Sequence, residues 1–312
     1  MDNTPPKVSV IMATHNRADI LPVSVSSVLE QTFRDFEFII TDDASSDHTP
    51  SVLKDLHNGD DRIIYQRSEQ NIGPGAARNM AIERSRGEYV AIMDDDDACR
   101  PHRLEREIKV LDSHPDVGLV FSSVEWINEN QELILISPGI VQAGRFPEDP
   151  DGVFELLHLE GSKIPNPTVM ARRDIIAGFK YPSYPWGPED RYMYLQMAAR
   201  GVKMKAISEP LVIQRRETNA SNLMNQKANA FRAQRIINQM IISWLRQNRI
   251  TRFDHLHKLA VSNQFIREAR YWQGLRGLSL CLLSVLRAPA HKRAYQTLLW
   301  FIKKAVNKLV PS

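Results

Sequence analysis

The chain is poor in cysteine and carries no long apolar segment. Only Cys99 and Cys281 occur among its 312 residues, and their separation fits no metal-ligand spacing. We therefore expect reduced thiols and a reducing compartment instead of a disulfide framework. The uncharged run 277–286 is ten residues long, well short of the ~20 needed to cross a bilayer. The sequence thus predicts no transmembrane helix.

Targeting and familiar nucleotide-binding signatures are also missing. The polar residues 1–7 and the short apolar run 8–13 do not form a secretory signal, which favours a cytoplasmic protein. No Gly-x-Gly-x-x-Gly follows the first apolar run, and no P-loop is present. These absences exclude the binding of a dinucleotide or a nucleoside triphosphate through those two motifs.

Acidic residues are scarce at the C-terminal end. Residues 264–312 contain nine Lys or Arg and one acid, Glu268, so they carry +8 and leave −5 for residues 1–263 of the +3 total. The nine basic residues are Arg267, Arg270, Arg276, Arg287, Lys292, Arg293, Lys303, Lys304 and Lys308. This end of the chain therefore differs physically from the rest, whose composition is that of an ordinary globular protein.

The first half of the chain alternates strand and helix patterns. Short apolar runs predict strands at 8–13, 36–41, 62–66, 89–93 and 117–123. Helical spacing and helix-end signals predict helices at 21–29, 49–59, 74–85 and 101–113, with Thr49 as the N-cap of the second. Such an order predicts an α/β fold with a parallel, doubly wound sheet, which binds ligands beyond the carboxyl ends of its strands.

Polar clusters follow three of these strands, at 14–17, 42–47 and 94–97. The third cluster is a run of four aspartates. Adjacent carboxylates repel one another and burying each costs several kcal/mol, so they need either a cation or a solvated turn. A hard divalent cation that also binds substrate phosphates would meet the first need. The residues alone leave both interpretations open.

Two other features suggest recognition of an anion or a base. The stretch 71–79, NIGPGAARN, enters a helix and offers backbone N–H groups and Arg78 to an anion, although its glycines could serve only as turn residues. Asp43 could accept a hydrogen bond from a pyrimidine N–H, or it could form an Asx turn leading to Thr49.

Three motifs in order resemble the nucleotide-binding half of glycosyltransferase family 2, which has the GT-A fold. They are VSVIMATHNRADILPVSVSSVLEQTFRDFEFIITDDASSD, NIGPGAARNMAIERSRGEYVAIMDDDD and RPHRLE, within residues 7–125. A thinner similarity continues through NPTVMARRDIIAGF and WGPEDRYMYLQMAARG to about Ser221. The resemblance implies a GT-A domain with a Rossmann-like mixed sheet over 1–222, divided into a nucleotide-sugar half 1–125 and an acceptor half 126–222. A helical, basic and amphipathic region 223–312 would follow it.

The resemblance also implies roles for residues of the nucleotide-sugar half. Asp43 would hold uracil, and Thr14 and Asn16 would lie in the same donor site. Arg78 would lie near the diphosphate. The family's Asp-x-Asp motif falls on Asp94 and Asp96, which would bind Mn²⁺ or Mg²⁺ with Asp96 as the likeliest direct ligand.

The surroundings of that motif follow from the same resemblance, with one departure. Asp95 or Asp97 would shape the ribose and metal environment. Many relatives place a histidine after a late strand as a further metal ligand, but this chain has none between Leu211 and Leu223. Glu217 stands nearest to that position.

In the acceptor half, the family's Glu-Asp pair falls on Glu189 and Asp190, with Asp190 as the general base. The residues alone equally allow a helix start, because acids favour the first helical turn. Trp186 could stack on a sugar face or simply pack. The proline-containing segment 144–167 predicts a loop, a short helix and a second loop at the mouth of the cleft.

Helical patterns dominate beyond residue 223. A stripe at Ile236, Ile237, Met240, Ile241 and Trp244 predicts packing against the catalytic domain. The final segment predicts a cationic amphipathic helix with an apolar face, which favours an anionic membrane surface, although a soluble cap or a dimer contact is also open. The apolar face comprises Tyr295, Leu298, Leu299, Ile302, Ala305, Val306 and Leu309, broadened by Trp300 and Phe301.

Together these features predict an inverting, metal-dependent glycosyltransferase. It would move a sugar from a nucleoside diphosphate, UDP above all, to a hydroxyl of a glycan or lipid-linked acceptor in surface polysaccharide or glycoconjugate assembly. The expected partners are that donor, that acceptor and an anionic membrane surface on the inner face of the cytoplasmic membrane, with no nucleic acid. The alternatives are a glycan-binding or scaffolding protein with a vestigial site, and a sugar nucleotidylyltransferase.

Overall fold

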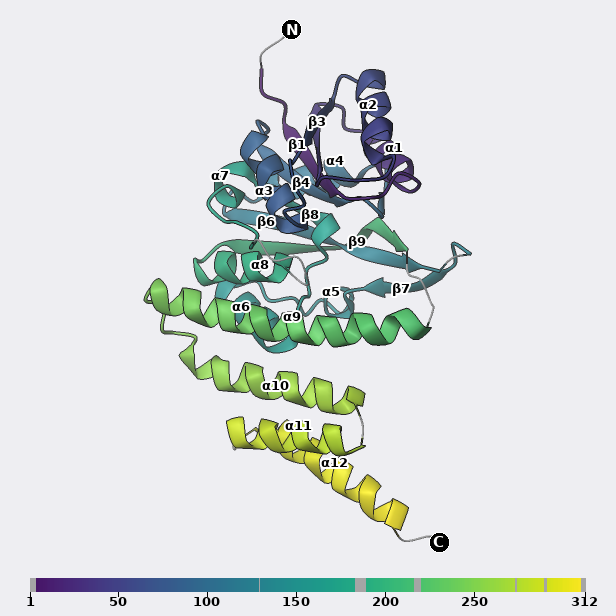
Figure 1. The fold of residues 1–312 in the computed structure, drawn as a ribbon. Helices are drawn as coiled ribbons and strands as arrows, with labels where there is room; N and C mark the ends of the chain where they lie inside the picture. Colours follow the sequence, from purple (N-terminus) through teal and green to yellow (C-terminus); the bar gives the residue numbers. More distant parts are fainter. Residues whose placement is uncertain are drawn as a thin grey trace.

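The structure, a computed structural model, describes residues 4–128, 130–182, 189–215, 220–272, 274–288 and 291–309. Within these ranges one nine-stranded sheet forms the centre of the molecule, and helices cover both of its faces (Figure 1). The strands are β1 (Val8–Thr14), β2 (Phe36–Asp42), β3 (Ile63–Arg67), β4 (Tyr89–Asp94), β5 (Ala98–Cys99), β6 (Val117–Ile127), β7 (Leu133–Ser137), β8 (Val169–Arg172) and β9 (Lys203–Arg215).

The sheet is mixed, as predicted. Its strand order is β3-β2-β1-β4-β8-β6-β9-β5, and β7 pairs with β6 outside that path. Strands β1 to β4 run parallel to one another, and β8 lies between β4 and β6 and runs antiparallel to both. The parallel strands β1 to β4 correspond to the predicted alternation of strands and helices. The sequence pattern did not predict β8, which lies between β4 and β6.

The helices of the first part alternate with these strands. They are α1 (Leu21–Leu29), α2 (Thr49–Gly59), α3 (Pro74–Arg84), α4 (Arg103–Ser113), α5 (Gly139–Gln142), α6 (Pro150–Glu160), α7 (Arg173–Ile176) and α8 (Glu189–Ala199), with a 3₁₀ turn η1 (Asn166–Thr168). The predicted N-cap was wrong by one position, because His48 precedes α2 and Thr49 is its first helical residue. α6 confirms the short helix predicted within 144–167.

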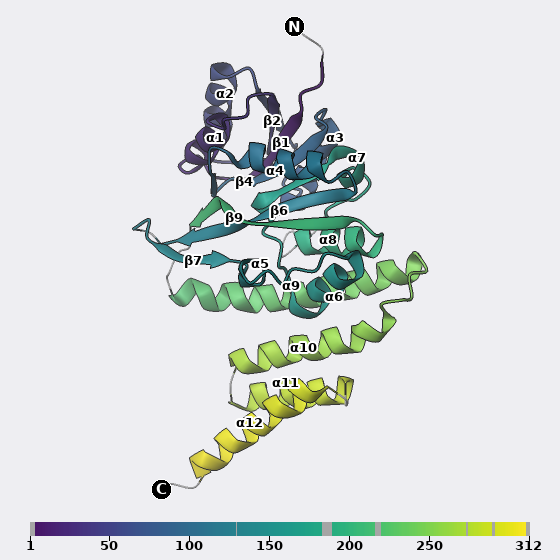
Figure 2. The same cartoon turned by 180° about the vertical axis from the view of Figure 1, so that it is seen from behind.

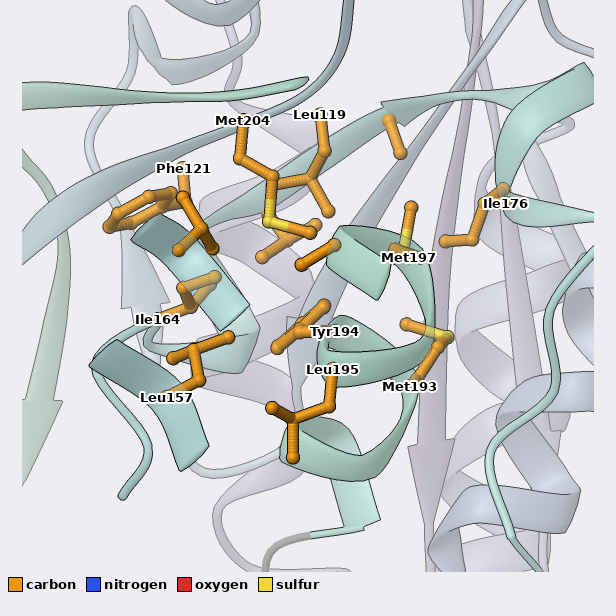
Figure 3. Close-up of a cluster of buried hydrophobic side chains, with 14 of the residues drawn as sticks. Leu119, Phe121, Leu157, Ile164, Ile176, Met193, Tyr194, Leu195, Met197 and Met204 are labelled. Carbon is orange, nitrogen blue, oxygen red and sulfur yellow. The ribbon is translucent and has the colours of Figure 1, made fainter. Parts of the chain in front are cut away.

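Both faces of the parallel strands are buried, because their side chains alternate. In β1 Val8, Val10 and Met12 join a cluster with α1 and α4, whereas Ile11 joins a second cluster on the other face. Figure 3 shows that second cluster, in which side chains of α6 and α8 meet those of the strands. An apolar run with both faces covered is the pattern of a parallel sheet.

A buried ion pair lies behind the aspartate run. The Arg103 side chain donates to Glu107 at 3.0 Å and to the backbone carbonyl of Ile92 in β4 at 2.9 Å. Both charged side chains are almost fully buried. Burial raises the pKa of the Glu107 carboxyl to about 7. Arg103 therefore fixes the backbone of β4 two residues before its carboxyl end.

Four longer helices follow the sheet: α9 (Ala220–Gln247), α10 (Asp254–Trp272), α11 (Gly274–Arg287) and α12 (Lys292–Leu309). Ile237 and Ile241 of α9 lie in the same apolar cluster as α8, which confirms that this stripe packs against the catalytic part. α10, α11 and α12 continue away from α9, so that α11 and α12 lie at the opposite end from β1 to β3 in both views (Figures 1 and 2).

Within the ranges that the structure describes, no helix combines the length and the apolar character needed to cross a bilayer.

The Glu107 carboxyl gives a pH-dependent prediction. Its pKa is about 7 in the fold against an ordinary 4.5, so the folded chain retains a proton that the unfolded chain loses. This contribution to stability is complete below pH 4.5 and is lost as the pH rises through 7. The stability of Glu107→Gln relative to the unchanged protein should therefore increase over this window, by at most about 1.4 kcal/mol per pH unit.

Urea unfolding at a series of pH values measures this difference. Glu155→Gln, on the exposed side of α6, is the matched control for the loss of one carboxyl group. A pH-independent difference for Glu107→Gln would show that the Glu107 carboxyl titrates normally.

Candidate active site

The three polar clusters meet at one edge of the sheet. In the parallel register Thr14 pairs with Asp42, and Ala13 pairs with Asp94. The carboxyl ends of β1, β2 and β4 therefore lie side by side, as the sequence predicted. A bound ligand at this edge would meet all three clusters at once.

The four aspartates do not share one environment. Asp94 accepts a 2.7 Å hydrogen bond from Arg78, and Asp97 accepts one of 2.8 Å from Gln214 of β9. Asp96 is the most accessible, with 48% of its side chain exposed. A single guanidinium, that of Arg17, stands 3.8 Å from Asp95 and 3.6 Å from Asp96.

Their negative charge is incompletely balanced. Burial raises the pKa of Asp95 to about 6. Burial, with the neighbouring Asp94 charge second, raises the pKa of Asp97 well above its usual range. A group whose charged form is disfavoured in this way is stabilised by a nearby cation. The oxygen donors of Asp94 and Asp96 suit a hard divalent ion that takes its other ligands from phosphate and water.

The protein does not supply a complete metal cage by itself. In the described part of the chain no three His, Cys, Asp or Glu side chains form a group that could hold an ion. Glu217, the nearest candidate for a further ligand, lies outside the described residues, as does Trp186. Both therefore stay predictions.

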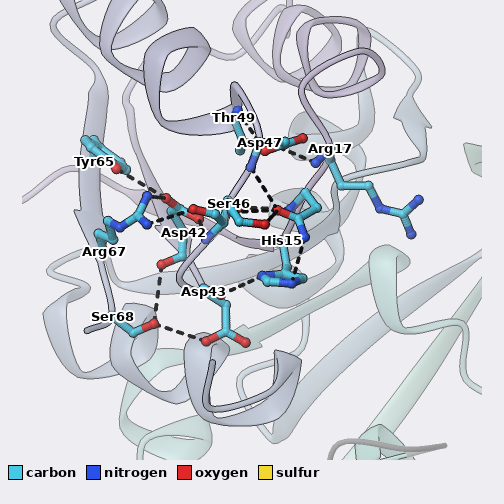
Figure 4. Close-up of polar contacts among 12 residues, drawn as sticks. His15, Arg17, Asp42, Asp43, Ser46, Asp47, Thr49, Tyr65, Arg67 and Ser68 are labelled. Atoms are coloured by element: carbon cyan, nitrogen blue, oxygen red, sulfur yellow. Dashed lines mark hydrogen bonds and ion pairs between the residues drawn. The ribbon is translucent and has the colours of Figure 1, made fainter. Parts of the chain in front are cut away.

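Asp43 is tightly held by the glycine-containing loop before α3. Its carboxylate accepts hydrogen bonds from the backbone N–H groups of Ile72 at 2.7 Å and Gly73 at 2.8 Å, and from Ser68 at 3.1 Å (Figure 4). In the structure these loop amides therefore bind the carboxylate of Asp43, which is the anion at this position. The Asx turn that leads to Thr49 is formed by Asp47, whose carboxylate accepts a hydrogen bond from the Thr49 N–H at 2.9 Å. The contact of Asp43 with uracil stays a prediction.

Residues after β1 connect the same loops. Asn16, in the left-handed backbone region with φ 54°, accepts a hydrogen bond from the Ser46 N–H at 2.7 Å. His15 contacts the Asp43 carbonyl at 2.6 Å through Nδ1, and its Nε2 lies 3.3 Å from the Asn71 amide. Thr14 is buried beside them. His15 was not singled out by sequence, because its partners lie 28 and 56 residues away.

Arg78 joins the two halves of the site. One end of its guanidinium donates to Asp94 and the other to Glu189 of α8, both at 2.7 Å, and only 10% of the side chain is exposed. A Cβ on Gly75 would come within 2.8 Å of the Pro182 carbonyl, so only glycine allows α3 this close to the acceptor half. The expected contact of Arg78 with diphosphate stays a prediction.

Asp190 lies beside Glu189 in the first turn of α8, and no Lys or Arg in the described ranges pairs with it. Burial, followed by the Glu189 charge, raises its pKa. An acid placed only to favour a helix start would have a lowered pKa. Arg191 fixes this turn from behind, because its buried guanidinium donates to the Leu157 carbonyl at 2.8 Å and to Asn238 at 2.9 Å.

Asn166 is a site residue that sequence reasoning missed. Its side-chain oxygen accepts hydrogen bonds from the hydroxyls of Tyr181 at 2.9 Å and Tyr194 at 2.7 Å, and its amide lies 3.4 Å from Asp94. Tyr194 is one helical turn beyond Asp190. Asn166 thus forms a second link between α8 and the end of β4. A polar residue between two prolines gave no signal for this role.

The sequence profile of Glycosyl transferase family 2 matches residues 9–176, more than half of the chain. The chain belongs to glycosyltransferase family 2. It is 33% identical over 228 residues to an uncharacterized glycosyltransferase of Methanocaldococcus jannaschii, covering 71% of this chain and 76% of that protein. It is 30% identical to an Escherichia coli UDP-Glc:alpha-D-GlcNAc-diphosphoundecaprenol beta-1,3-glucosyltransferase, covering 61% and 69%. With three other curated relatives the match spans only 30% to 44% of their length.

Solved GT-A glycosyltransferases have the same fold. S. aureus TarS in complex with UDP-GlcNAc superposes with a TM-score of 0.57 at 17% identity, covering 94% of this chain and 89% of that one. The mannosyltransferase PcManGT of Pyrobaculum calidifontis, in complex with GDP-Man and Mn²⁺, gives 0.54 at 18% identity, covering 98% and 88%. The family 2 chain is therefore a glycosyltransferase with a GT-A-type mixed sheet, and the nucleotidylyltransferase alternative is set aside.

The bridge through Arg78 gives the prediction for this family 2 site. In Arg78→Met the partly buried carboxylates of Asp94 and Glu189 lose their shared, buried cation, which should lower the free energy of unfolding by up to about 3–5 kcal/mol. Lys180→Met is the control, because Lys180 and Glu83 form an exposed pair and its loss should cost less than about 1 kcal/mol. Urea unfolding measures both, and equal small losses would remove the structural role assigned to Arg78.

Proposed function

We propose that this enzyme transfers a sugar with inversion from a nucleoside diphosphate, most favourably UDP, to a hydroxyl of a lipid-linked glycan. The observation that carries the proposal is the bridge from Asp94 through Arg78 to Glu189. It brings the carboxylates suited to a donor and its metal next to Asp190, with which no Lys or Arg in the described ranges pairs.

The donor site would extend along the ends of β1 and β2. Thr14, Asn16 and Asp43 line this edge, and the backbone around them is fixed by the hydrogen bonds of Asp43 and Asn16. The UDP-sugar named for the E. coli relative and the UDP-GlcNAc bound by TarS support a uridine nucleotide. The GDP-Man of the mannosyltransferase is the specific competitor to exclude.

Asp94 and Asp96 would hold Mn²⁺ or Mg²⁺, with Asp95 and Asp97 around them. The Mn²⁺ in the mannosyltransferase complex supports this choice. Such an ion supplies Lewis-acid stabilisation to the leaving diphosphate when it is bound. Arg17, which is 45% exposed and only loosely paired with Asp95 and Asp96, would add positive charge on the same side.

Asp190 would act as the general base. The acceptor oxygen forms a bond to the anomeric carbon while the bond to the diphosphate oxygen breaks, and the hydroxyl proton passes to the Asp190 carboxylate. A base opposite the leaving group gives one displacement and hence inversion. Such proton transfer contributes about 10²–10⁴-fold to the rate. The hydrogen bonds of Arg191 and Asn166 keep α8 in position for it.

The acceptor part of the proposal rests on chemistry at the lipid surface. The E. coli relative is named for a diphosphoundecaprenol acceptor, which supports a lipid-linked glycan and hence a role in surface polysaccharide or glycoconjugate assembly. A protein that modifies such an acceptor would work at the inner face of the cytoplasmic membrane. The basic region 264–312 would favour that location.

The metal assignment predicts the effect of Asp96→Ala. Transfer should be abolished, because a direct ligand is lost, whereas stability should be unchanged, because the side chain is half exposed and has like-charged neighbours. Nucleotide release from UDP-sugars in Mn²⁺ measures the activity. Asp55→Ala, on the exposed side of α2, is the control with retained activity. Near-normal transfer by Asp96→Ala at saturating donor would refute the assignment.

The base assignment predicts a different outcome for Asp190→Asn. The amide keeps the shape but accepts no proton, so turnover should fall by ~10²-fold or more while the affinity for UDP is unchanged. Calorimetric titration with UDP and Mn²⁺ measures binding separately from turnover. Weakened UDP binding with normal turnover would place Asp190 on the donor side instead.

A further inference from the structure

The last two helices expose an unusual share of the apolar surface. Of the ten large apolar side chains that the described residues leave exposed, six lie on α11 and α12. They are Leu282, Leu283, Leu286, Tyr295, Leu299 and Trp300, which we call the α11–α12 face. Leu286 is 77% exposed and Leu299 is 56% exposed. Clustered exposed side chains of this kind mark an interaction surface.

Each helix buries its other side, so the face is not a product of loose packing. Cys281 and Ser284 of α11 are fully buried, as is Ala294 of α12. Leu298 and Phe301, which the sequence placed on the exposed apolar face, pack instead into a small cluster with α10 and α11. The exposed residues of α11 recur three and four positions apart and form one stripe.

The charge around this face has a single sign. No acidic residue follows Glu268 in the chain. Arg287, Lys292 and Arg293 are exposed where α11 ends and α12 begins, between Leu286 and Tyr295. Apolar side chains bordered by exposed cations are complementary to an anionic lipid interface, into which leucine and tryptophan insert while the cations meet the headgroups.

We propose that the α11–α12 face docks on an anionic lipid bilayer and lies in its interface. This proposal adds a membrane-binding surface to the proposed function. It rests on that function only for the lipid-linked acceptor. A second copy of the chain fits this face less well than a bilayer does. A two-fold contact would bring together two segments 264–312, each with a net charge of +8. Helices α11 and α12 lie at the far end of the molecule from β1 to β3 (Figure 2), so a bilayer at this end would be remote from those strands.

Flotation of the full-length protein with vesicles tests the proposal. The protein should float with vesicles that contain phosphatidylglycerol, and much less with pure phosphatidylcholine vesicles or at high salt. Replacing Arg287, Lys292 and Arg293 by Ser should reduce partitioning by the order of 10²-fold, at about fivefold for each cation near the surface. Lys54, Lys109 and Lys205 replaced by Ser form the charge-matched control and should leave it unchanged.

The apolar contribution has its own matched pair of variants. Leu282, Leu286 and Leu299 replaced by Ser should abolish flotation, because these side chains would no longer be buried in the interface. The control replaces exposed apolar residues of β7, Leu133 and Leu135, by Ser and should float normally. Circular dichroism confirms that each variant is folded.

Several results would overturn the proposal. The first is equal flotation of the α11–α12 variants and the unchanged protein. The second is a loss of flotation in the β7 control equal to that of the leucine variant. The third is a dimer in solution that the leucine substitutions convert to monomer. Its failure is separable from failure of the proposed function. Asp190→Asn should float normally without transfer, whereas the leucine variant should still release nucleotide from UDP-sugar with a detergent-soluble acceptor.

Discussion

Mutual repulsion among four carboxylates at the end of β4 is the constraint on which the rest of this site depends. Their arrangement is tolerated because the repulsion is offset by several partners. Asp94 is paired with Arg78, and Asp97 accepts a hydrogen bond from Gln214. Asp95 and Asp96 share a loose contact with Arg17. The raised pKa of Asp95 shows that this balance is incomplete. A divalent ion would supply the missing positive charge and a diphosphate would complete its ligand shell, which links binding of the metal to binding of the donor.

The same balancing of charge couples the two halves of the domain. Arg78 pairs with Asp94 at the end of β4 and with Glu189 at the start of α8, so one buried guanidinium sets the spacing between these two elements. Asn166 adds a neutral link between the same elements. Glu189 is thereby paired with Arg78, whereas no Lys or Arg in the described ranges pairs with Asp190. The two adjacent acids thus have different environments.

Much of this could be predicted from sequence, where local patterns determine structure. Short apolar runs predicted β1 and β4, and the parallel order placed their polar ends at one edge. The pattern did not reveal partners far apart in the chain. Nothing local shows that the loop amides of Ile72 and Gly73 bind Asp43 or that Asn166 approaches Asp94. The predicted apolar face of α12 is only partly exposed, because Leu298 and Phe301 are covered by neighbouring helices.

The central claim is that the aspartates after β4 bind a metal and a uridine diphosphate jointly. Thermal unfolding of the full-length protein with UDP, GDP, Mn²⁺ and their combinations tests it most directly, because only a ligand that binds the folded state raises the midpoint. We expect the unfolding midpoint to rise clearly with UDP and Mn²⁺ together and to change little with either alone. The joint rise should be lost when Asp94 and Asp96 are both replaced by Asn. An equal rise with UDP in the presence of a chelator, or an unchanged joint effect in that double variant, would contradict the claim.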